Sequence, residues 1–175
     1  MNYCSHCAHP VEFRVPDGDT LPRYVCPSCH TVHYQNPRVV VGCVPEHDGR
    51  LLLCKRAIEP RLGYWTVPAG FLENGETLEA GAARETWEEA RARVEIATML
   101  AVVNVTHVHQ VHIMFRATMQ TSEFAPGPES LEVELIRPED IPWQLLAFPS
   151  VTYTLRRYLE GGERLHITEM ARRKR

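Results

Sequence analysis

The sequence predicts an α/β fold in which a mixed β-sheet lies between helices, preceded by a small unit that contains paired cysteines. Apolar, β-branched runs of strand length occupy residues 38–44, 94–104 and 111–120, and such runs are typical of buried strands. A segment rich in alanine and glutamate at 77–90 favours a helix between the first two of these runs. Two Cys-x2-Cys pairs stand near the N-terminus. These observations indicate one α/β domain with a small appendage.

The cysteines of residues 1–35 predict a zinc ribbon. Cys4 and Cys7 form one pair and Cys26 and Cys29 the other, with 18 residues between the pairs. This spacing lets two knuckles hold one tetrahedral Zn²⁺ through four thiolates. Disulfides are the alternative, which a cytoplasmic setting disfavours. We expect the metal to provide much of the folding free energy of so small a unit. We expect four nearby histidines to be surface or surrounding groups: His6, His9, His30 and His33.

The second domain is expected to span residues 36–163. Its strands are predicted at 38–44, 50–56, 64–69, 94–104, 111–120 and 131–136. The sequence His47-Asp48-Gly49 predicts a hairpin turn between the first two strands. Cys43 and Cys54 lie within apolar runs, so we expect them to be inert core thiols rather than nucleophiles.

Two predicted helices complete this domain. Thr77 can cap the first helix, and Glu79 places negative charge in its first turn. Gly81 is a poor helix former, so we expect it to allow close packing. The second helix is predicted at 149–161, where apolar residues recur at helical spacing. The remaining segment, 164–175, is predicted to be a basic C-terminal tail.

Composition and charge limit the classes of function. The chain has 175 residues, of which 44% are hydrophobic and 23% charged, as in soluble globular proteins, and no apolar run reaches the length of a membrane span. The N-terminus enters the cysteine motif at once, so we expect no secretory signal and a cytoplasmic protein. The net charge is −3 although the last four residues are basic. The body of the chain is therefore acidic, and we expect no general nucleic-acid binding.

The first predicted helix carries three carboxylates on one side. Glu85 and Glu89 are four residues apart, and Glu88 is three residues from Glu85, so their side chains share a face. Like charges at these spacings repel, so we expect a cation among them. Oxygen ligands favour a hard divalent cation, Mg²⁺ or Mn²⁺, over Zn²⁺. The alternative is a solvated acidic face, which is the commoner origin of such a run.

The stretch at 70–92 resembles the Nudix box, G-x5-E-x7-R-E-U-x-E-E-x-G-U, in which U is bulky and apolar. The matching positions are Gly70, Glu76, Arg84, Glu85, Glu88 and Glu89. The sequence departs from the box at Thr86 and Ala92, which are small for U, and at Arg91, where the box has glycine. A left-handed conformation at Arg91 would cost roughly 1 kcal/mol. The resemblance implies a Nudix α/β/α sandwich and a hydrolase of nucleoside diphosphates linked to another group.

The resemblance also implies roles for the matching residues. The implied Mg²⁺ ligands are the side chains of Glu85 and Glu89, assisted by Glu88, and the backbone carbonyl of Ala69. Arg84 would orient the carboxylates, and Glu76 would pair with Arg84 or brace the loop before the helix. The base that takes a proton from the attacking water varies within the family. Its candidates here are Glu88, Glu129 and Glu132.

A zinc ribbon before a Nudix domain resembles two groups of enzymes. The NAD(H) pyrophosphatases carry a Ser-Gln-Pro-Trp-Pro-Phe-Pro type motif after the box, which residues 98–112 lack. The FAD and ADP-ribose pyrophosphatases share blocks with this chain at 34–37, 40–43, 52–56, 84–90, 124–132 and 146–150. The second resemblance implies release of AMP from a small ADP-linked nucleotide. Trp65, Phe71 and Phe124 are candidates for stacking on its rings, although core packing is the favoured role of each.

Two other functions remain as alternatives. One is an NAD(H) pyrophosphatase, and the other is a non-catalytic binding module, because zinc ribbons often bind nucleic acids or proteins. The three intact box glutamates and the acidic body argue against the binding module. Three histidines after the box are minor candidates for contact with substrate: His107, His109 and His112. Family members of this type are often homodimers, so a homodimer is the expected assembly.

Overall fold

The structure is a computed structural model that describes residues 1–171. It divides into two compact units, Met1–Pro37 and a second unit that begins at Arg38. The basic residues 172–175 of the predicted tail lie outside the described residues.

The first unit is a small three-stranded antiparallel sheet beside the cysteines. Its strands, in spatial order, are β1 (Glu12–Arg14), β2 (Arg23–Val25) and β3 (Val32–His33). Its buried residues are Cys4, Pro16, Val25 and Cys26. A core this small contributes little stability, which agrees with the expectation that a bound ion provides much of it.

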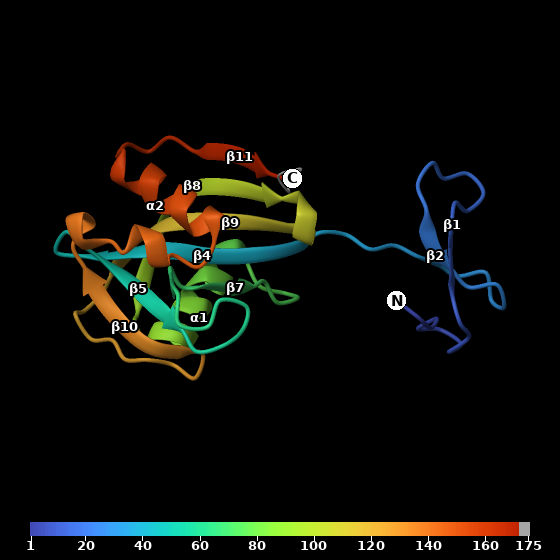
Figure 1. Cartoon of the computed structure of the whole chain (residues 1–175), viewed down its shortest axis with the longest axis horizontal. Helices are drawn as coiled ribbons and strands as arrows, with labels where there is room; N and C mark the ends of the chain where they lie inside the picture. The colour runs from blue at the N-terminus through green and yellow to red at the C-terminus, as the bar shows by residue number, and fades with distance from the viewer. Residues whose placement is uncertain (172–175) are drawn as a thin grey trace. The chain divides into compact units, whose positions relative to one another are not determined.

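The second unit is an eight-stranded sheet between two helices (Figure 1). Its strands are β4 (Arg38–His47), β5 (Arg50–Arg56), β6 (Trp65–Thr66), β7 (Ala69–Phe71), β8 (Val94–Val105), β9 (Gln110–Met119), β10 (Ser130–Ile136) and β11 (His166–Met170). The main path is β10-β5-β4-β9-β8-β11, with β6 beside β5 and β7 beside β4. The β4–β9 and β8–β11 pairs are parallel and the other pairs are antiparallel.

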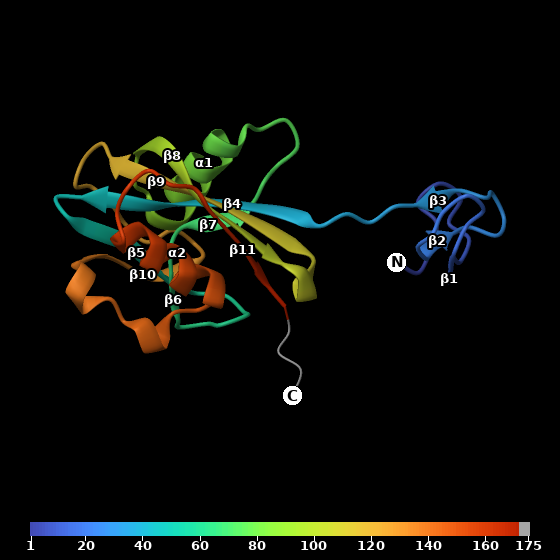
Figure 2. The same cartoon turned by 90° about the horizontal axis from the view of Figure 1, so that it is seen from above.

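The helices α1 (Leu78–Ala90) and α2 (Pro149–Leu159) lie on opposite faces of this sheet (Figure 2). Three short 3₁₀ turns complete the unit: η1 (Thr106–Val108), η2 (Pro138–Asp140) and η3 (Trp143–Leu145). The predicted mixed sheet between helices is therefore confirmed. Within residues 1–171, neither helix has the length and apolar character needed to cross a membrane.

β4 is covered on both faces, which explains its unbroken apolar sequence. Val41 and Cys43 pack with Ala82 of α1 in the layer between the sheet and that helix. Val44 packs with Leu155 of α2 in the core on the other face. At the end of β4, residues 48 and 49 form the predicted two-residue turn with φ values of 48° and 74°, as a type I′ hairpin requires.

The predicted strand at 64–69 is wrong in its bounds, because two short strands replace it. β6 pairs with β5, whereas β7 pairs with β4. Pro68 stands between them and has no N–H to donate, so a single continuous ladder cannot form there. The Pro68 carbonyl instead accepts a hydrogen bond from Cys43 N–H at 3.2 Å. The chain thereby changes strand partner just before the glutamate-rich helix.

The structure extends the second unit beyond the boundary predicted at residue 163. β11 runs parallel to β8 and forms one edge of the sheet. Its side chains alternate in exposure, with Ile167 72% exposed and Met170 packed against the core. A five-residue strand with so little buried apolar surface gives a weak signal in sequence, which is why the sequence predicts a tail over the whole of 164–175.

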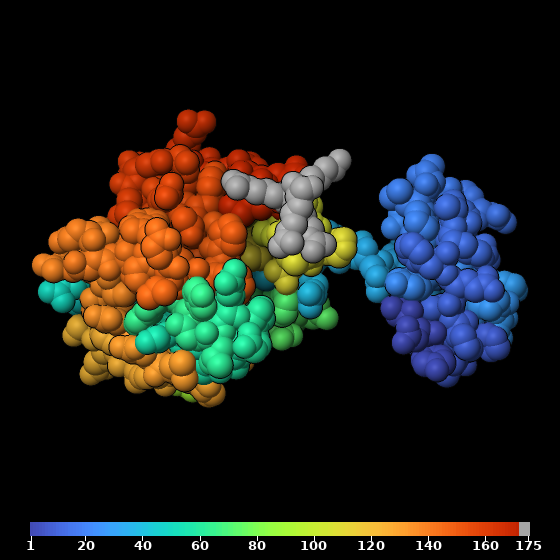
Figure 3. All heavy atoms as spheres, in the orientation of Figure 1, coloured from blue at the N-terminus to red at the C-terminus, as the bar shows by residue number. Residues whose placement is uncertain are grey.

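The space-filling view shows the loop between β5 and β6, in green, at the surface of the second unit (Figure 3). Ile58 and Leu62 of this loop are exposed. Gly63 N–H donates to the Arg56 carbonyl at 2.8 Å and so closes the loop at its base.

α1 begins and packs as the sequence predicts. The Thr77 hydroxyl accepts a hydrogen bond from Ala80 N–H at 3.1 Å, which caps the helix. A Cβ on Gly81 would crowd Leu72 and Val41, so glycine permits close packing on the sheet. These two features fix where α1 starts and how close it lies to β4.

Arg91 ends α1 in the predicted left-handed conformation, with φ 51° and ψ 20°. Its N–H donates to the Trp87 carbonyl at 2.9 Å, which is the hydrogen bond of a left-handed helix end. Its guanidinium also lies 5.7 Å from the centre of the Trp87 ring. The side chain at this position thus makes contacts that a glycine would lose.

Replacing Arg91 by glycine should stabilise the protein by roughly 0.5 to 1 kcal/mol, because glycine adopts a positive φ without strain. Arg91→Ala is the matched control, since it removes the same side-chain contacts and keeps the strained backbone. Chemical unfolding of the three proteins measures both effects. Equal stability of the glycine and alanine variants would show that backbone strain at this position is negligible.

Candidate functional site

Arg84 lies among the carboxylates of α1 and the loop before it. Its guanidinium donates to both oxygens of Glu76, at 2.6 and 3.0 Å. Its Nη1 donates to Glu85 at 2.7 Å and to Glu88 at 2.9 Å. Its Nη2 also donates to the carbonyl of Phe71 at 3.1 Å. One arginine therefore links the loop, the end of β7 and two helix carboxylates.

Glu76 and Glu85 both accept hydrogen bonds from Arg84, but their pKa values shift in opposite directions. The bidentate hydrogen bond from Arg84 lowers the pKa of Glu76. Burial raises the pKa of Glu85, although Arg84 opposes this change. Glu76 is thus an ionised carboxylate whose two oxygens both bind Arg84. Glu85 keeps an oxygen, Oε2, that no hydrogen bond among the described residues engages.

Glu89 is the most buried carboxylate of the helix. It is 6% exposed, and its Oε2 accepts a hydrogen bond from Ala69 N–H at 3.2 Å. Burial raises its pKa to about 8, and the charge of Glu85 adds to this rise while the Ala69 N–H opposes it. The adjacent Gly70 leaves room for Glu85, because a Cβ there would overlap its carboxylate. The β7 turn therefore faces two carboxylates at once.

This donor set suits a hard divalent cation. Carboxylate and carbonyl oxygens are the ligands that Mg²⁺ and Mn²⁺ prefer, and a buried carboxylate with a raised pKa is ionised more readily when positive charge is nearby. Among residues 1–171, however, the acidic side chains do not converge as the four cysteines do. Metal ligation by Glu85, Glu88, Glu89 and the Ala69 carbonyl therefore stays a prediction.

The segment at 124–130 closes the C-terminal end of α1. Ala125 N–H and Gly127 N–H donate to the last two carbonyls of the helix, those of Ala90 and Glu89, both at 2.9 Å. A Cβ on Gly127 would overlap the carbonyl of Glu88, so this close approach needs glycine. The docked segment leads directly into β10. Of the two remaining candidates for the base, Glu129 lies just before β10 and Glu132 lies within it.

These two candidates, Glu129 and Glu132, differ in position. The charge of Glu129 raises the pKa of both Glu85 and Glu89, so it lies within electrostatic range of the site. Glu132 instead pairs with Lys55, with Nζ and Oε2 3.2 Å apart. Position therefore favours Glu129 over Glu132 as an acceptor for a proton from water.

Arg56, the last residue of β5, is a site residue that the sequence motifs do not predict. Its charge lowers the pKa of Glu89, which places a second cation near the carboxylates. Its Nε donates to the Pro60 carbonyl at 2.9 Å, and its guanidinium lies 5.2 Å from the centre of the Phe148 ring. The feature of the sequence that could have indicated this role is an arginine at the end of an apolar strand. A guanidinium beside carboxylates that bind a cation is suited to bind a phosphate of the substrate.

The three aromatic candidates for stacking lie in different environments. Trp65 is 7% exposed and belongs to the main core, and Phe124 packs against a second core cluster. Phe71 is 43% exposed and lies 4.6 Å from the guanidinium carbon of Arg38. Phe71 is therefore the most accessible of the three, and stacking on substrate stays a prediction for each.

The histidines that follow β8 lie in other contacts. His107 Nδ1 is 3.4 Å from the carbonyl of Met170. His112 Nε2 is 2.9 Å from the side-chain oxygen of Gln110, and burial lowers the pKa of His112. Within the described residues, no hydrogen bond joins these histidines to the carboxylates of α1.

The four cysteines of the first unit converge as their spacing predicts. Their sulfur atoms all lie within 4.8 Å of one another, with Cys7 3.5 Å from Cys26 and 3.4 Å from Cys29, and Cys4 3.6 Å from Cys29. Zn–S bonds of about 2.3 Å in a tetrahedron separate the sulfurs by about 3.8 Å, so the cluster fits one Zn²⁺. None of the four forms a disulfide. His33 Nε2 lies 3.3 Å from Cys4 Sγ, beside the cluster.

Comparison with known sequence families identifies both units. The profile described as NUDIX domain matches residues 36–158. The chain belongs to the NUDIX family. A second profile, for the zinc-ribbon domain described as Nudix N-terminal, matches residues 2–35. The resemblance inferred from the Nudix box and the cysteine pairs is therefore confirmed.

Curated relatives of this NUDIX protein have several names. A MutT-like protein of Streptomyces ambofaciens is 37% identical over 102 residues, 58% of this chain and 64% of the relative. The NAD-capped RNA hydrolase NudC of Chromobacterium violaceum is 34% identical over 131 residues, 74% of this chain and 47% of the relative. An ADP-ribose pyrophosphatase of Methanocaldococcus jannaschii is 30% identical over 113 residues, 62% of this chain and 67% of the relative. The chain thus spans less than two thirds of the first two relatives.

Solved structures agree with the family assignment. A NUDIX hydrolase from Nitrosomonas europaea is 52% identical, with a TM-score of 0.92 over 97% of this chain and 100% of that chain. The NUDIX domain of Shewanella oneidensis NrtR, solved with ADP ribose, is 22% identical, with a TM-score of 0.60 over 73% of this chain and 89% of that chain. The second likeness shows the shared fold.

Elemental analysis of the purified protein should find about one zinc per chain, because four thiolates complete a tetrahedral site. Cys26→Ala should lose this zinc, whereas the matched control Cys43→Ala should keep it, since Cys43 lies in the core of the other unit. Detection of the four N-terminal cysteines as disulfides after alkylation and mass spectrometry would contradict the zinc assignment.

Proposed function

We propose that this NUDIX protein is a divalent-cation-dependent pyrophosphohydrolase. It cleaves the diphosphate of an ADP-linked compound, FAD or ADP-ribose, to AMP and the other monophosphate. One observation carries the proposal: Glu85 and Glu89 pack against the β7 turn, where Glu89 is buried with a raised pKa. Burying a carboxylate destabilises a fold unless it gains a partner. A cation shared with a diphosphate would provide that partner.

Each group around the carboxylates has a distinct task in this reaction. A bound Mg²⁺ or Mn²⁺ would neutralise the diphosphate oxygens and lower the pKa of the attacking water. The side chains of Glu85, Glu88 and Glu89 and the Ala69 carbonyl would hold the ion. Arg84 restrains Glu85 and Glu88 through its hydrogen bonds, and Glu76 fixes Arg84 in turn. Preorganised ligands of this kind need little rearrangement during the reaction.

The proton of the attacking water needs an acceptor, and the diphosphate needs a cationic partner. Glu129 is the favoured acceptor outside the helix, because its charge is felt by Glu85 and Glu89; Glu88 is the alternative, since its side chain is 53% exposed. Arg56 would bind a phosphate oxygen and so place the diphosphate beside the carboxylates.

The choice of an ADP-linked substrate rests on sequence blocks outside the box. Segments 124–132 and 146–150 resemble those of FAD and ADP-ribose pyrophosphatases. The first of these segments includes the loop docked on α1, and the second includes Phe148, which contacts Arg56. The Methanocaldococcus relative named ADP-ribose pyrophosphatase supports the same substrate class.

An NAD-containing substrate is the second candidate. Relatives named NAD-capped RNA hydrolase NudC, such as the Chromobacterium protein, favour it. The absence from 98–112 of the motif typical of NAD(H) pyrophosphatases argues against it. NADH and NAD-capped RNA therefore belong in any substrate panel. A non-catalytic binding module is disfavoured by the complete Arg84–glutamate network, and a homodimer remains the expected assembly.

Glu85→Gln and Glu89→Gln should each lower kcat for AMP release by at least about a hundredfold, because the amide removes charge that a hard cation needs. Glu79→Gln is the matched control, since Glu79 lies in the first turn of the same helix and is exposed. It should keep nearly full activity. Quantified AMP release from FAD and ADP-ribose at saturating Mg²⁺ gives the comparison.

The same assay, extended to NADH and NAD-capped RNA, decides between the substrates. Retention of more than a tenth of wild-type kcat by both glutamine variants would exclude these residues as the main ligands. If wild-type protein releases AMP only from NADH, or cleaves only NAD-capped RNA to nicotinamide mononucleotide and an RNA with a 5′-monophosphate, the second candidate replaces the first. If it releases neither AMP from the small nucleotides nor nicotinamide mononucleotide from NAD-capped RNA, the binding-module alternative takes their place.

A further inference from the structure

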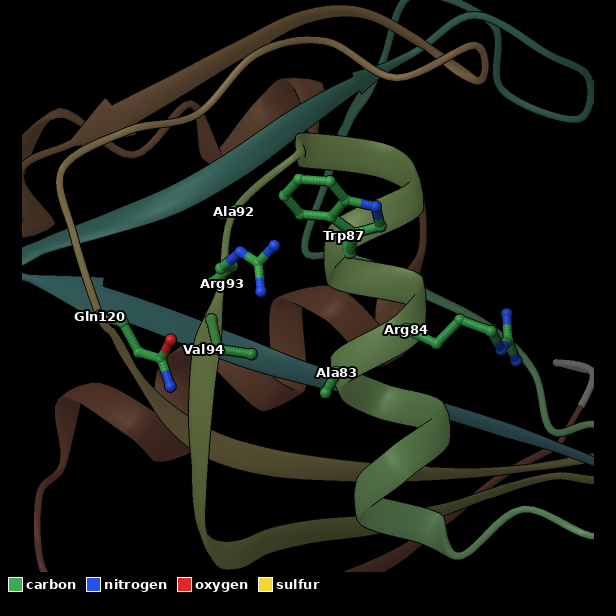
Figure 4. A pocket seen from close by; sticks show the side chains of 7 residues that line it. All are labelled: Ala83, Arg84, Trp87, Ala92, Arg93, Val94 and Gln120. Carbon is green, nitrogen blue, oxygen red and sulfur yellow. The ribbon is translucent and has the colours of Figure 1, made fainter.

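A hollow of about 390 Å³ lies beside α1, apart from the helix side that carries Glu85 and Glu89. We name it the Trp87 hollow; its lining residues are Ala83, Arg84, Trp87, Ala92, Arg93, Val94 and Gln120. Figure 4 shows Trp87 above Arg93 at one end, with Gln120 across from the helix. Trp87 is two residues from Glu85 and from Glu89, and side chains at that spacing do not face each other on a helix. Trp87 therefore projects from a different side of α1 than Glu85 and Glu89, and Arg84 borders both the hollow and the carboxylates.

Charge in the Trp87 hollow is positive, in an otherwise acidic protein. Arg93 and Arg91 lie 5.0 and 5.7 Å from the centre of the Trp87 ring. Neither arginine forms an ion pair with an acidic side chain of the described residues, whereas Arg84 forms three. No acidic residue lines the hollow. Arg93, which lines the hollow, and Arg91, which lies near the Trp87 ring but does not line the hollow, therefore have donors available for an anion.

The aromatic group of the hollow is accessible. Trp87 is 41% exposed, which is unusual for a residue that gains so much from burial. The neighbouring Arg91 occupies a left-handed position that glycine would adopt with less strain. An exposed indole and an arginine with a strained backbone both lower the stability of the protein without a ligand. Both costs are explained if the two groups act together on a ligand.

We infer that the Trp87 hollow binds a nucleotide, with its base against the indole of Trp87 and its phosphate at Arg91 and Arg93. Every base has a π-face that can stack on tryptophan or on a guanidinium plane, and guanidinium donors match phosphate oxygens. The amide of Gln120 has a donor and an acceptor for a base edge or a ribose hydroxyl. The occupant is either a free mononucleotide or one nucleotide of a single strand. This inference does not depend on which diphosphate the carboxylate site cleaves.

The test measures binding without turnover, in Mg²⁺-free buffer at low salt. Calorimetry with AMP and fluorescence anisotropy with a labelled five-nucleotide RNA give the two affinities. Trp87→Leu and Arg93→Gln should each weaken binding by about tenfold or more, because stacking and phosphate contacts are lost. Arg156→Gln is the matched control, since Arg156 lies 5.6 Å from the ring centre of another tryptophan, Trp143, and it should bind like wild type.

A second readout needs no variant. The indole N–H resonance of Trp87 should shift during titration with AMP or RNA, while those of Trp65 and Trp143 stay in place. Binding of AMP identifies a free nucleotide, and binding of RNA alone identifies a strand; either result with the expected losses supports the inference. Undetectable binding of both, or wild-type affinity in both variants, would overturn it. Self-association that Trp87→Leu abolishes, without nucleotide binding, would instead assign the hollow to a second copy of this chain.

These outcomes are separate from those of the hydrolysis assay. Trp87 and Arg93 take no part in the proposed carboxylate chemistry, so failure to bind nucleotide at the hollow leaves Mg²⁺-dependent AMP release from ADP-ribose unchanged. Conversely, a protein that releases no AMP can still bind AMP at Trp87.

Discussion

The site in the second unit depends on how the repulsion between the carboxylates of one short helix, α1, is offset. Glu85 and Glu89 of α1 face the β7 turn, and Glu89 is almost fully buried, while the exposed Glu88 shares Arg84 with Glu85. Arg84 offsets part of this repulsion by binding Glu76, Glu85 and Glu88. It does not neutralise Glu89, whose pKa burial raises to about 8. We therefore expect the remaining imbalance to favour binding of a cation at this site.

Much of the surrounding fold maintains this arrangement. Thr77 caps the start of α1, and the segment at 124–130 donates hydrogen bonds to its last carbonyls, so both ends of the helix have partners. Gly81 lets α1 lie close to β4, and Gly70 leaves space for the carboxylate of Glu85. The sheet supports the site, because the pairing of β7 with β4 positions the turn that faces the glutamates. The proposed cation binding thus follows from close packing around glutamates that repel one another.

Features set by local spacing could be predicted from sequence, and features set by tertiary contact could not. The cap at Thr77, the left-handed Arg91, the hairpin turn after β4 and the convergence of the four cysteines each follow from residues close together in the chain or from a metal-binding pattern. The short edge strand β11 was missed because its five residues bury little apolar surface. Arg56 was missed, and Glu129 could not be ranked above Glu132, because their distance from Glu89 depends on how separate strands and loops meet.

The buried Glu89 should release its proton when the carboxylate site binds a metal ion. If Glu89 is a ligand that is largely protonated below about pH 8, Mg²⁺ must displace its proton in order to bind. Calorimetric titration of the zinc-loaded protein at pH 6 and pH 8, in buffers of different ionisation enthalpy, measures this release. We expect tighter binding at pH 8, proton release at pH 6, and loss of both effects in Glu89→Gln. Equal affinity at the two pH values with no proton release would contradict the account.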